Sequence, residues 1–383
     1  MNIGIFTDCY TPEVNGIVTS LRLFITAFRA RGHSVFIFAP DNEDKDDSDE
    51  ITIERFPSTL VWGKQVRLSL PFIKSKNIAT LNLDIIHVQT PGPIGMVGTR
   101  LGKKLHIPLV YTYHTRIERY AHFYAHLPLW VEKGALTFAA KVFYNRHAVV
   151  VAPSTGIKRE LSSYVKSPIS VIPTGVDTIK NQAQAKTVDV ADVLRRYGVA
   201  PNDEFVITTS RLGKEKNISF IIDAFCSLHN KRPATKLLIV GDGPDRDDLA
   251  TYAANSACRD HIIFLGFQTQ STLFALYQKA KVFVFSSLTE TQGMVVLEAL
   301  TMGLPVVALA GTGTEDLLAG DMGGFMVAPH PELFTQKILE LVTSDKLWEQ
   351  KHLEALQRAT EFSIEKMAER MLVLYTTLTK NPT

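Results

Sequence analysis

The chain contains 383 residues, of which 45% are hydrophobic and 21% are charged. This length exceeds that of one ordinary core and predicts two domains, and the composition is typical of a soluble globular protein. No apolar run approaches the roughly 18 residues of a membrane span, and the opening MNIGIF leads directly into a strand, so we expect neither a membrane helix nor a signal peptide. The scattered residues Cys9, Cys226 and Cys258 predict reduced thiols of a cytoplasmic protein, with neither a disulfide framework nor a zinc cluster.

The net charge of +2 conceals an uneven distribution. Residues 1–175 carry 20 basic and 14 acidic side chains, whereas residues 176–383 carry 21 and 25. The excess is largest between residues 64 and 166, with 15 basic against 4 acidic side chains. A basic excess confined to one domain favours an anionic partner, a nucleic acid or a membrane with anionic lipids, over basic residues that merely solvate helix faces.

The first half alternates strands and helices. A helix over residues 17–31 follows a loop that contains Gly16, and residues 41–50, DNEDKDDSDE, form an acidic loop. Backbone N–H groups and the helix dipole favour an anion at such a helix start, although the loop lacks the GxGxxG and GxxxxGK[ST] patterns. We expect strands near residues 3–6, 35–39, 51–55, 85–89, 109–112, 149–152 and 169–172.

The second half repeats this alternation after residues 176–200, a linker with a short helix. It includes helices near 295–302 and 363–378. We expect its strands near residues 205–210, 236–241, 262–266, 282–286 and 305–309. Two such alternations predict an α/β fold with two doubly wound parallel sheets, in which ligands bind at the carboxyl ends of the strands.

Polar loops follow four strands of the second half. Arg211 and Lys216 follow the first strand, and a planar guanidinium beside an ammonium group suits a pyrophosphate. Glu290 lies in the loop after 282–286, and Glu298 lies in the first turns of the next helix. The other two loops are GDGP at 241–244 and Gly266-Phe267. Any one of these could be a turn, but four at one sheet edge indicate a binding site.

The two glutamates allow two interpretations. Paired carboxylates act as general acid and nucleophile in glycoside hydrolases. That chemistry does not require Arg211 and Lys216 nearby. We therefore favour carboxylates that accept hydrogen bonds from ribose and sugar hydroxyls.

Taken together, these motifs resemble the family 4 retaining glycosyltransferases of the GT-B fold, over essentially the whole chain. The motifs are Glu290-x7-Glu298, Arg211 with Lys216 in SRLGKEKNI, GDGP at 241–244 and NGI at 15–17. Three further stretches resemble the diacylglycerol glucosyltransferases, the monoglucosyldiacylglycerol synthase branch: TDCYTPEVNGIVTSL at 7–21, YHTRIERYAHF at 113–123 and SSLTETQG at 286–293. The resemblance implies two Rossmann-like domains that face a cleft. Residues 1–175 would face acceptor and membrane, residues 176–360 would bind the nucleotide sugar, and a final helix at 361–383 would cross back.

The resemblance also implies roles for individual residues. Arg211 and Lys216 would hold the pyrophosphate of a nucleotide sugar such as UDP-glucose, and Glu298 would hold its ribose. Glu290 and the backbone at Gly293 and Met294 would hold the sugar. The implied donor-binding set is Gly16, Arg211, Lys216, Gly241, Gly243, Phe267, Glu290, Gly293, Met294 and Glu298.

The implied catalytic residues are His114, Glu290, Arg211 and Lys216. His114 would lie near the 6-hydroxyl and the anomeric carbon of the sugar, and Gly16 would let its loop approach the donor phosphates. Thr115, Glu118 and Tyr120 are implied to bind the acceptor. The departing diphosphate can be stabilised by fixed cations and N–H groups, so no carboxylate nucleophile is needed.

We expect no cofactor and no essential metal. Asp44-Lys45-Asp46 and Asp245-Arg246-Asp247 match the DxD pattern of metal-binding glycosyltransferases, but the first lies in the acidic loop and the second opens a helix, where acids suit the dipole. His122 and His126 could form a metal-binding pair, but a third ligand is not evident.

Residues 116–146 mix basic and aromatic side chains, which suits a helix lying in a lipid headgroup layer, with a buried helix face as the alternative. No nucleic-acid-binding module is present. The prediction is transfer of a hexose to the hydroxyl of 1,2-diacylglycerol by a cytoplasmic enzyme bound peripherally to the inner, anionic face of the membrane. The alternatives are another donor such as GDP-mannose, a soluble acceptor, or a nucleotide-sugar-binding module without catalysis.

Overall fold

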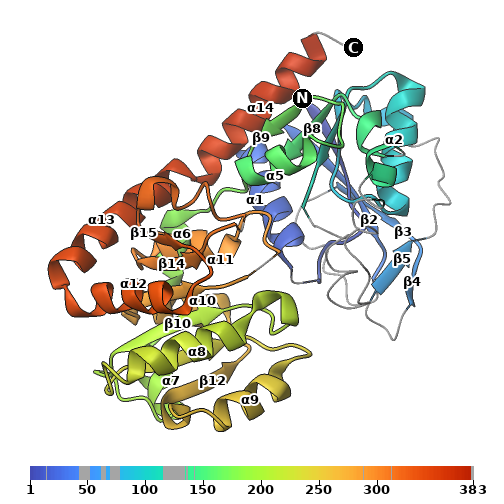
Figure 1. The fold of residues 1–383 in the computed structure, drawn as a ribbon. Helices are drawn as coiled ribbons and strands as arrows, with labels where there is room; N and C mark the ends of the chain where they lie inside the picture. Colours follow the sequence, from blue (N-terminus) through green and yellow to red (C-terminus); the bar gives the residue numbers. More distant parts are fainter. Residues whose placement is uncertain are drawn as a thin grey trace. The chain divides into compact units, whose positions relative to one another are not determined.

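The computed structural model describes residues 1–13, 15–42, 52–61, 66–69, 78–114, 134, 137–141, 143–287, 289–311 and 313–380. The chain divides into two compact units (Figure 1). Unit 1 comprises Met1–Gly175 together with Ile364–Thr383, and unit 2 comprises Val176–Ser363. The C-terminal segment therefore belongs to the same unit as the N-terminal residues.

Unit 1 is built on a seven-stranded parallel sheet in the order β3-β2-β1-β6-β7-β8-β9. Its strands are short and mostly buried on both faces, as expected for a parallel sheet covered by helices. They are β1 (Asn2–Phe6), β2 (Ser34–Pro40), β3 (Thr52–Phe56), β6 (Ile85–Val88), β7 (Leu109–Thr112), β8 (Val149–Ala152) and β9 (Ile169–Val171). A separate antiparallel pair joins β4 (Ser58–Val61) and β5 (Val66–Ser69), and η1 (Ile78–Leu81) and η2 (Tyr144–Arg146) are single 3₁₀ turns.

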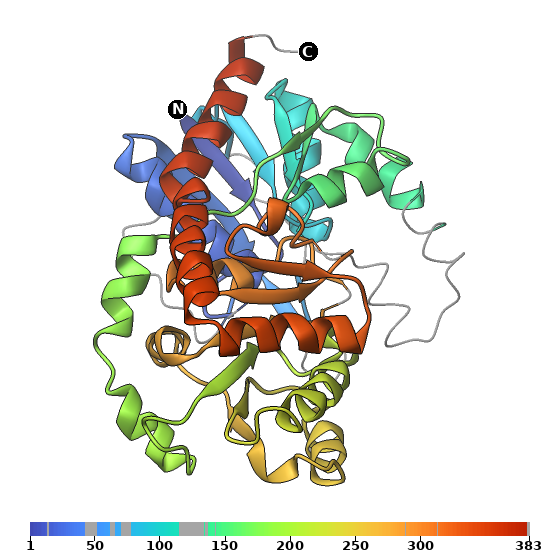
Figure 2. The same cartoon turned by 60° about the vertical axis from the view of Figure 1, so that its left-hand side comes forward.

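The alternating side chains of β1 divide the core of unit 1 into two faces. Ile3 and Ile5 pack on one face with α1 (Gly16–Ala30) and α14 (Ile364–Lys380), as Figure 2 shows for the two helices. Phe6 points to the other face, which is covered by α2 (Pro93–Leu105) and α5 (Thr155–Leu161). The final helix is thus a core element of unit 1.

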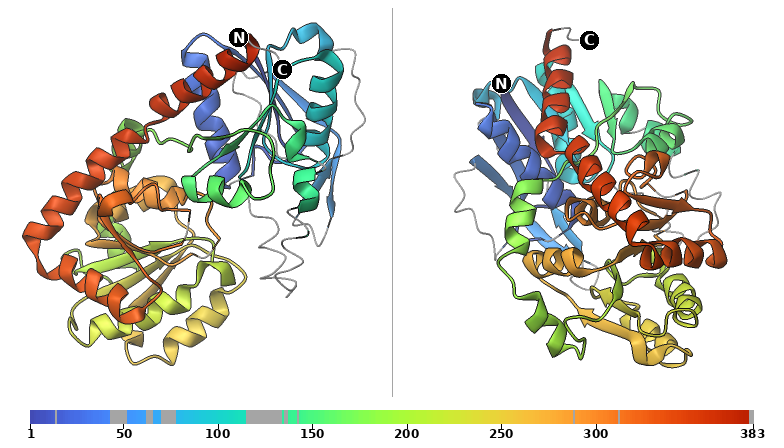
Figure 3. Two further views of the ribbon diagram at one scale, coloured as in Figure 1. Left: turned by 45° about the horizontal axis from the view of Figure 1, so that its top comes forward. Right: turned by 90° about the vertical axis from the view of Figure 1, so that its left-hand side faces the viewer.

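Unit 2 contains a six-stranded parallel sheet in the order β12-β11-β10-β13-β14-β15. Its strands are β10 (Phe205–Thr209), β11 (Lys236–Val240), β12 (Ile262–Gly266), β13 (Val282–Phe285), β14 (Val306–Leu309) and β15 (Gly324–Val327). Helices cover both faces (Figure 3). One face carries α6 (Thr178–Ala185), α7 (Val190–Arg196), α10 (Gln270–Lys279), α11 (Met294–Thr301) and α13 (Asp345–Glu361). The other carries α8 (Ile218–His229), α9 (Arg246–Ala254) and α12 (Pro331–Thr343), and η3 (Lys214–Lys216), η4 (Arg259–His261) and η5 (Ala319–Asp321) are 3₁₀ turns.

The predicted fold class is confirmed: each unit is a doubly wound parallel sheet. The predicted strands coincide with observed ones to within one or two residues. Strands β4, β5 and β15 were not predicted, and residues 176–200 form two helices rather than a linker with one.

The prediction of reduced cysteines is wrong for two of the three. Cys226 and Cys258 form a disulfide, with their Cα atoms 5.2 Å apart, and Cys9 is free. Cys226 lies on the helix before β11, and Cys258 lies just before β12. Since β11 and β12 are adjacent and parallel, the segments that lead into them meet at the same edge of the sheet, although 32 positions separate the cysteines in sequence.

Candidate active site

The sheet of unit 2 has a topological switch point between β10 and β13. The chain moves from β10 outward through β11 to β12 and then returns to the other side of β10 as β13. The loops that follow β10 and β13 therefore leave the sheet in opposite directions, and such a point is where α/β sheets bind ligands. Arg211 and Lys216 lie in the first of these loops and Glu290 lies in the second.

The structure brings Lys216 and Glu290 together. The Lys216 Nζ atom donates to Glu290 Oε1 in an ion pair, and the side chains are 14% and 20% exposed. The Ser287 hydroxyl donates to the same carboxylate oxygen at 3.2 Å. The Ser286 hydroxyl lies 2.9 Å from the carbonyl oxygens of both Lys216 and Asn217. The two loops at the switch point are therefore cross-linked by polar contacts.

Arg211 differs from Lys216 in having no hydrogen-bond or ion-pair partner in the described part of the chain. It is exposed, and it makes no hydrogen bond or ion pair with any residue that the structure describes. Its loop is held by the backbone instead, since the Leu212 N–H donates to the Asp242 carbonyl at 2.9 Å and the Asp245 N–H donates to the Leu212 carbonyl at 3.1 Å. A fixed loop with an unpaired guanidinium can bind an anion without first breaking an ion pair.

Gly241 and Gly243 are required by the packing of this loop. A Cβ atom on Gly241 would lie 1.9 Å from the Ser210 carbonyl oxygen, and one on Gly243 would lie 2.3 Å from the Leu212 carbonyl oxygen. Gly241 also has a φ of +128°, which L side chains rarely adopt. Its N–H donates to the Gly266 carbonyl at 2.8 Å, and the next residue, Phe267, is 72% exposed.

Helix α11 begins at Met294 with a free N-terminus. Its N-cap residue, Gly293, has a φ of 83° and provides no side-chain cap. A Cβ atom at Gly293 would lie 2.5 Å from the Thr314 methyl carbon, so the neighbouring loop closes tightly over this position. The Gly313 N–H also donates to the Glu290 carbonyl at 3.0 Å. The uncapped N–H groups of α11 are thus held close to the Glu290 loop and can bind an acceptor oxygen.

Glu298 has a different environment from Glu290. It lies within α11 and is half-buried, and the burial of its carboxyl group raises its pKa to about 7, against the lowering effect of a hydrogen bond from Gln270. Burial raises the pKa of Tyr277 well above its usual value, and the nearby Glu298 charge raises it further. A carboxyl group of this kind can accept hydrogen bonds from hydroxyl groups and changes its charge near neutral pH.

Unit 1 has its own switch point, between β1 and β6. Asp8 follows β1 and reaches across it: its carboxylate accepts hydrogen bonds from the Thr90 hydroxyl at 2.5 Å and from the N–H groups of Ile94 and Gly95 at 2.8 and 3.3 Å. Burial raises the pKa of Asp8, against the effect of these hydrogen bonds. Asp8 therefore joins the β1 loop to the start of α2.

His114 follows β7 and is held in place by Gln89, which follows β6. The His114 Nε2 atom lies 2.7 Å from Gln89 Oε1, so Nε2 carries the proton in this pair, because an amide oxygen only accepts. Burial lowers the pKa of His114 to about 4. The imidazole is therefore neutral at physiological pH.

A second buried histidine lies beside this pair. His87 contacts the Tyr375 hydroxyl through Nδ1 and the Thr112 hydroxyl through Nε2, the latter at 2.6 Å. Burial, the largest of three causes, lowers its pKa to about 3. Both histidines line a cavity between the sheet, α1 and α14, together with Ile5, Ser20, Leu21, Phe24, Phe28, Gln89, Thr112, Pro153, Ile172, Thr174, Met371 and Tyr375.

Gly16 is the first residue of α1, after the N-cap Asn15, whose side chain accepts from the Val18 N–H at 3.0 Å. A Cβ atom on Gly16 would meet nothing within 4 Å, so packing inside unit 1 does not require glycine there. The predicted acceptor residues Thr115, Glu118 and Tyr120 lie outside the described residues, as do His122, His126 and the DxD match at 44–46.

Among the residues that the structure describes, no group of three or more His, Cys, Asp and Glu side chains could hold a metal ion. The second DxD match lies at the start of a helix: Asp245 is the N-cap residue of α9 and Asp247 lies in its first turn. In the same parts of the chain, no helix is both long and apolar enough to cross a membrane.

Two Rossmann-like units, each a doubly wound parallel sheet with polar side chains in the loops at its switch point, are the fold class of the GT-B glycosyltransferases. Comparisons with known proteins agree. The model for glycosyl transferases group 1 matches residues 191–360, and the model for Glycosyltransferase Family 4 matches residues 14–180. The crystal structure of Anabaena Alr3699/HepE in complex with UDP-glucose has a TM-score of 0.77, at 20% identity, and the match covers 99% of this chain and 100% of the other.

Two relatives extend the comparison. The chain is 32% identical over 380 residues to the alpha-monoglucosyldiacylglycerol synthase of Streptococcus pneumoniae, covering 98% of this chain and 85% of that protein. It is 31% identical to the enzyme of that name from Acholeplasma laidlawii, covering 80% of each. The chain belongs to the family 4 glycosyltransferases, its activity is that of a hexosyltransferase, and the predicted resemblance is confirmed.

The sequence did not single out two residues that the structure places at the switch point of unit 1. Asp8 is a single acid in a loop, and nothing in the sequence shows that it crosses to α2. Gln89 belongs to none of the motifs above and appears only as the last residue of the predicted strand 85–89. Its signal is positional, because it follows β6 directly, where a side chain at a strand end can reach the neighbouring loop.

Proposed function

We propose that this enzyme transfers glucose from UDP-glucose to the free hydroxyl of 1,2-diacylglycerol at a membrane surface, with retention at the anomeric carbon. The observation that carries the proposal is the similarity, over most of the chain, to two proteins that are both alpha-monoglucosyldiacylglycerol synthases. UDP-glucose as donor is also in keeping with the HepE complex, although that likeness bears on the fold alone.

The donor is proposed to lie at the switch point of unit 2. Arg211 and Lys216 would bind the diphosphate, and Glu298 would accept hydrogen bonds from the ribose. Glu290 and the N–H groups at the start of α11 would bind the hydroxyls of the glucose. The Lys216–Glu290 ion pair supports this division, because it fixes both charged groups next to each other and leaves Arg211, which has no partner among the described residues, for the phosphate.

The reaction breaks the bond between the anomeric carbon and the diphosphate oxygen and forms a bond from the same carbon to the acceptor oxygen. The acceptor proton passes to the departing phosphate, which leaves on the same face. The main task of the protein is then to stabilise the charge that develops on the diphosphate. Two cations and a helix N-terminus can do this, so we propose that no metal ion is essential. His114, whose imidazole is neutral at physiological pH, would form a hydrogen bond with the sugar.

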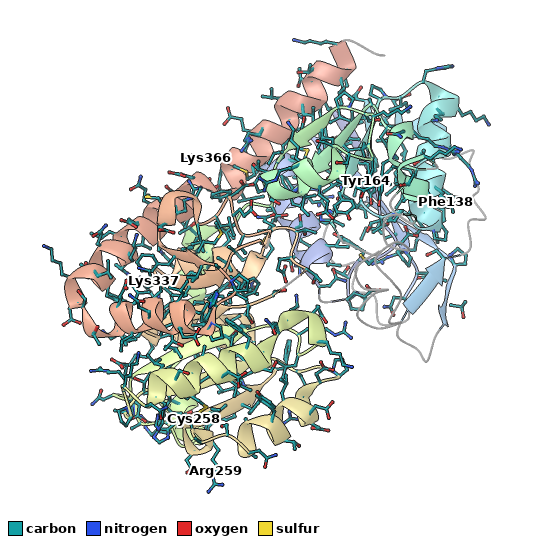
Figure 4. The ribbon with its side chains drawn as sticks, viewed as in Figure 1. Phe138, Tyr164, Cys258, Arg259, Lys337 and Lys366 are labelled. Carbon is teal, nitrogen blue, oxygen red and sulfur yellow. A yellow bond between two sulfur atoms is a disulfide. The ribbon has the colours of Figure 1, made fainter. Side chains whose placement is uncertain are left out.

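Contact with the membrane is proposed for unit 1. Between residues 64 and 166 the basic side chains outnumber the acidic ones by 15 to 4. Lys103 and Lys104 end helix α2, and Phe138, labelled in Figure 4, is 68% exposed. Basic side chains attract anionic headgroups, and an exposed ring can enter the interface.

The test is a donor panel of UDP-glucose, UDP-galactose and GDP-mannose with diacylglycerol in liposomes, and the mass of the product is read out. We expect glucosyldiacylglycerol from UDP-glucose, with activity that rises with anionic lipid and falls with salt. Arg211→Gln should lower turnover, whereas the matched control Arg196→Gln, at an exposed position of α7, should not. Transfer only from GDP-mannose, or only to a soluble acceptor, would refute the proposal.

A further inference from the structure

Two segments of unit 2 with the same pattern lie side by side at the edge of the sheet opposite to the donor loops. One is Cys226-x2-His229 at the end of α8, and the other is Cys258-x2-His261 around η4. The cysteines are joined to each other, and the two histidine rings are packed against each other with centroids 4.2 Å apart. The disulfide and the contact between the histidine rings therefore each join one segment to the other.

Local geometry brings each cysteine next to its own histidine. On an α-helix, residues three apart are neighbours on one face, which holds for Cys226 and His229. In a 3₁₀ turn the side chains at such positions are aligned, and the His261 N–H donates to the Cys258 carbonyl at 3.0 Å in that way. The disulfide and the packed pair of imidazoles therefore join the same two segments, whose cysteines are 32 positions apart in sequence.

One ring atom in this cluster lacks the hydrogen bond that its burial demands. Nδ1 of His229 is buried and has no hydrogen-bond partner among the described residues. Arg259, which lies between Cys258 and His261, points away from the protein in Figure 4 and is 64% exposed, so its charge does not occupy the cluster.

We propose that, once the Cys226–Cys258 disulfide is reduced, these four side chains bind one Zn²⁺ ion in a tetrahedral Cys₂His₂ site. Two thiolates and two imidazoles are a common donor set for structural zinc. In such a site the two sulfurs lie about 3.8 Å apart and the two nitrogens about 3.3 Å apart. Cysteines with Cα atoms 5.2 Å apart and rings with centroids 4.2 Å apart can reach those separations by side-chain rotation.

The disulfide and the zinc site exclude each other. Reduction by a dithiol transfers two electrons and two protons to the disulfide, giving two thiols and oxidising the dithiol to its own disulfide. Binding of Zn²⁺ then releases the two thiol protons and leaves a centre with no net charge, which suits a half-buried place. With the sulfurs joined, neither thiolate is available to bind a metal ion. The site lies away from Arg211 and Lys216. Its role would therefore be to cross-link α8 to the segment before β12, independently of the catalytic chemistry.

The experiment uses the full-length protein, oxidised or reduced with a phosphine, and titrates it with Zn²⁺ against a chromogenic chelator. We expect one equivalent to bind to the reduced protein and none at this site to the oxidised one. Co²⁺ in place of Zn²⁺ should give the visible bands of a tetrahedral site and a sulfur-to-cobalt charge-transfer band. His229→Gln and His261→Gln should each lower the Zn²⁺ affinity about 100-fold, since each removes one of four ligands.

Matched controls separate loss of a ligand from loss of the fold. The two histidine variants keep both cysteines, so their oxidised forms should still contain the disulfide and melt like the oxidised wild type. Cys9→Ser and His330→Gln, which change a cysteine and a histidine elsewhere, should bind Zn²⁺ like the wild type. The proposal is overturned if the reduced protein binds less than about a tenth of an equivalent, if both histidine variants bind Zn²⁺ as tightly as the wild type, or if Cys258→Ser does so.

Discussion

The half-buried carboxyl group of Glu298 leads to a prediction in which stability and donor binding change in opposite directions. Its pKa rises from 4.5 to about 7, chiefly because of burial. A group whose pKa is raised on folding favours the folded state fully below its unfolded pKa, and this contribution is lost as the pH rises through the folded pKa. For Glu298 the window runs from pH 4.5 to about 7. At about 1.4 kcal/mol per pH unit, ionisation of Glu298 costs about 3 kcal/mol of stability by pH 8.

Glu298→Gln removes the charge and keeps the shape. We therefore expect the variant to be more stable than the wild type at pH 8, by up to about 3 kcal/mol, and nearly equal to it at pH 4.5. The same change should weaken the binding of UDP-glucose by about 10- to 100-fold, because an amide replaces a carboxylate that accepts from the ribose hydroxyls. Misfolding would lower stability and binding together, so the opposite signs are diagnostic.

The assay is urea unfolding at several pH values between 4.5 and 8, with donor affinity from calorimetry at pH 8. Glu349→Gln, an exposed position on α13, is the control and should show no such pH dependence. If the stability difference between Glu298→Gln and the wild type does not change with pH, the burial argument is wrong. If the stability difference appears as expected but donor affinity is unchanged, the placement of the ribose is wrong.

Three further changes test the site. Lys216→Met should weaken donor binding at least about 10-fold, measured by calorimetry. It should also cost about 1–3 kcal/mol of stability, measured by urea unfolding, because the half-buried Glu290 carboxylate loses its partner. Unchanged donor affinity would place the diphosphate elsewhere. Gly16→Ala should leave the melting temperature unchanged, since the added Cβ atom would meet nothing within 4 Å. The substitution should lower turnover if the donor phosphates approach this backbone. Full activity would exclude that role for Gly16. Gln89→Leu should lower kcat about 10-fold, with little change in KM or melting temperature. The reason is that His114 keeps its position but loses the hydrogen bond that fixes its proton on Nε2. A loss of stability without this loss of kcat would show that Gln89 has only a structural role.

Most of the fold could be predicted because the strands are short apolar runs separated by clear breaks. The runs at 205–210 and 282–286, for example, are continuous and β-branched or aromatic, as expected for strands buried on both faces. The strands that were missed lack this signal. Residues 58–61 and 66–69 are short antiparallel strands outside the main sheet, in which polar and apolar residues are mixed. Strand β15 begins with Gly324, whose missing side chain lets it approach the Val306 carbonyl oxygen, 2.0 Å from where a Cβ would lie.

The candidate site was predictable residue by residue but not contact by contact. Arg211, Lys216 and Glu290 stand out as charges after strands, and parallel pairing of β10 with β13 then places them at one edge. The ion pair between Lys216 and Glu290 depends on loop conformations that no periodicity encodes. The Asp8 and Gln89 contacts are of the same kind, and so is the meeting of Cys226 with Cys258, because each joins loops whose order in the sheet is known only from the topology.

The cations of the unit 2 loops and the cavity histidines of unit 1 differ in charge, and the difference bears on how the proposed reaction would divide the work of catalysis. In unit 2 the loops carry the basic side chains of Arg211 and Lys216. In unit 1 the two histidines that line the cavity are His87 in β6 and His114 after β7, and burial lowers their pKa values to about 3 and 4, so both are neutral. Loss of a diphosphate demands positive charge where the phosphate leaves and hydrogen bonds, but no charge, where the sugar hydroxyls lie. A protonated imidazole beside the sugar would instead oppose the positive charge that develops on the anomeric carbon as the bond breaks. With the donor placed as proposed, the neutral His114 would add no positive charge beside the sugar, and Arg211 and Lys216 would supply the charge that the diphosphate needs.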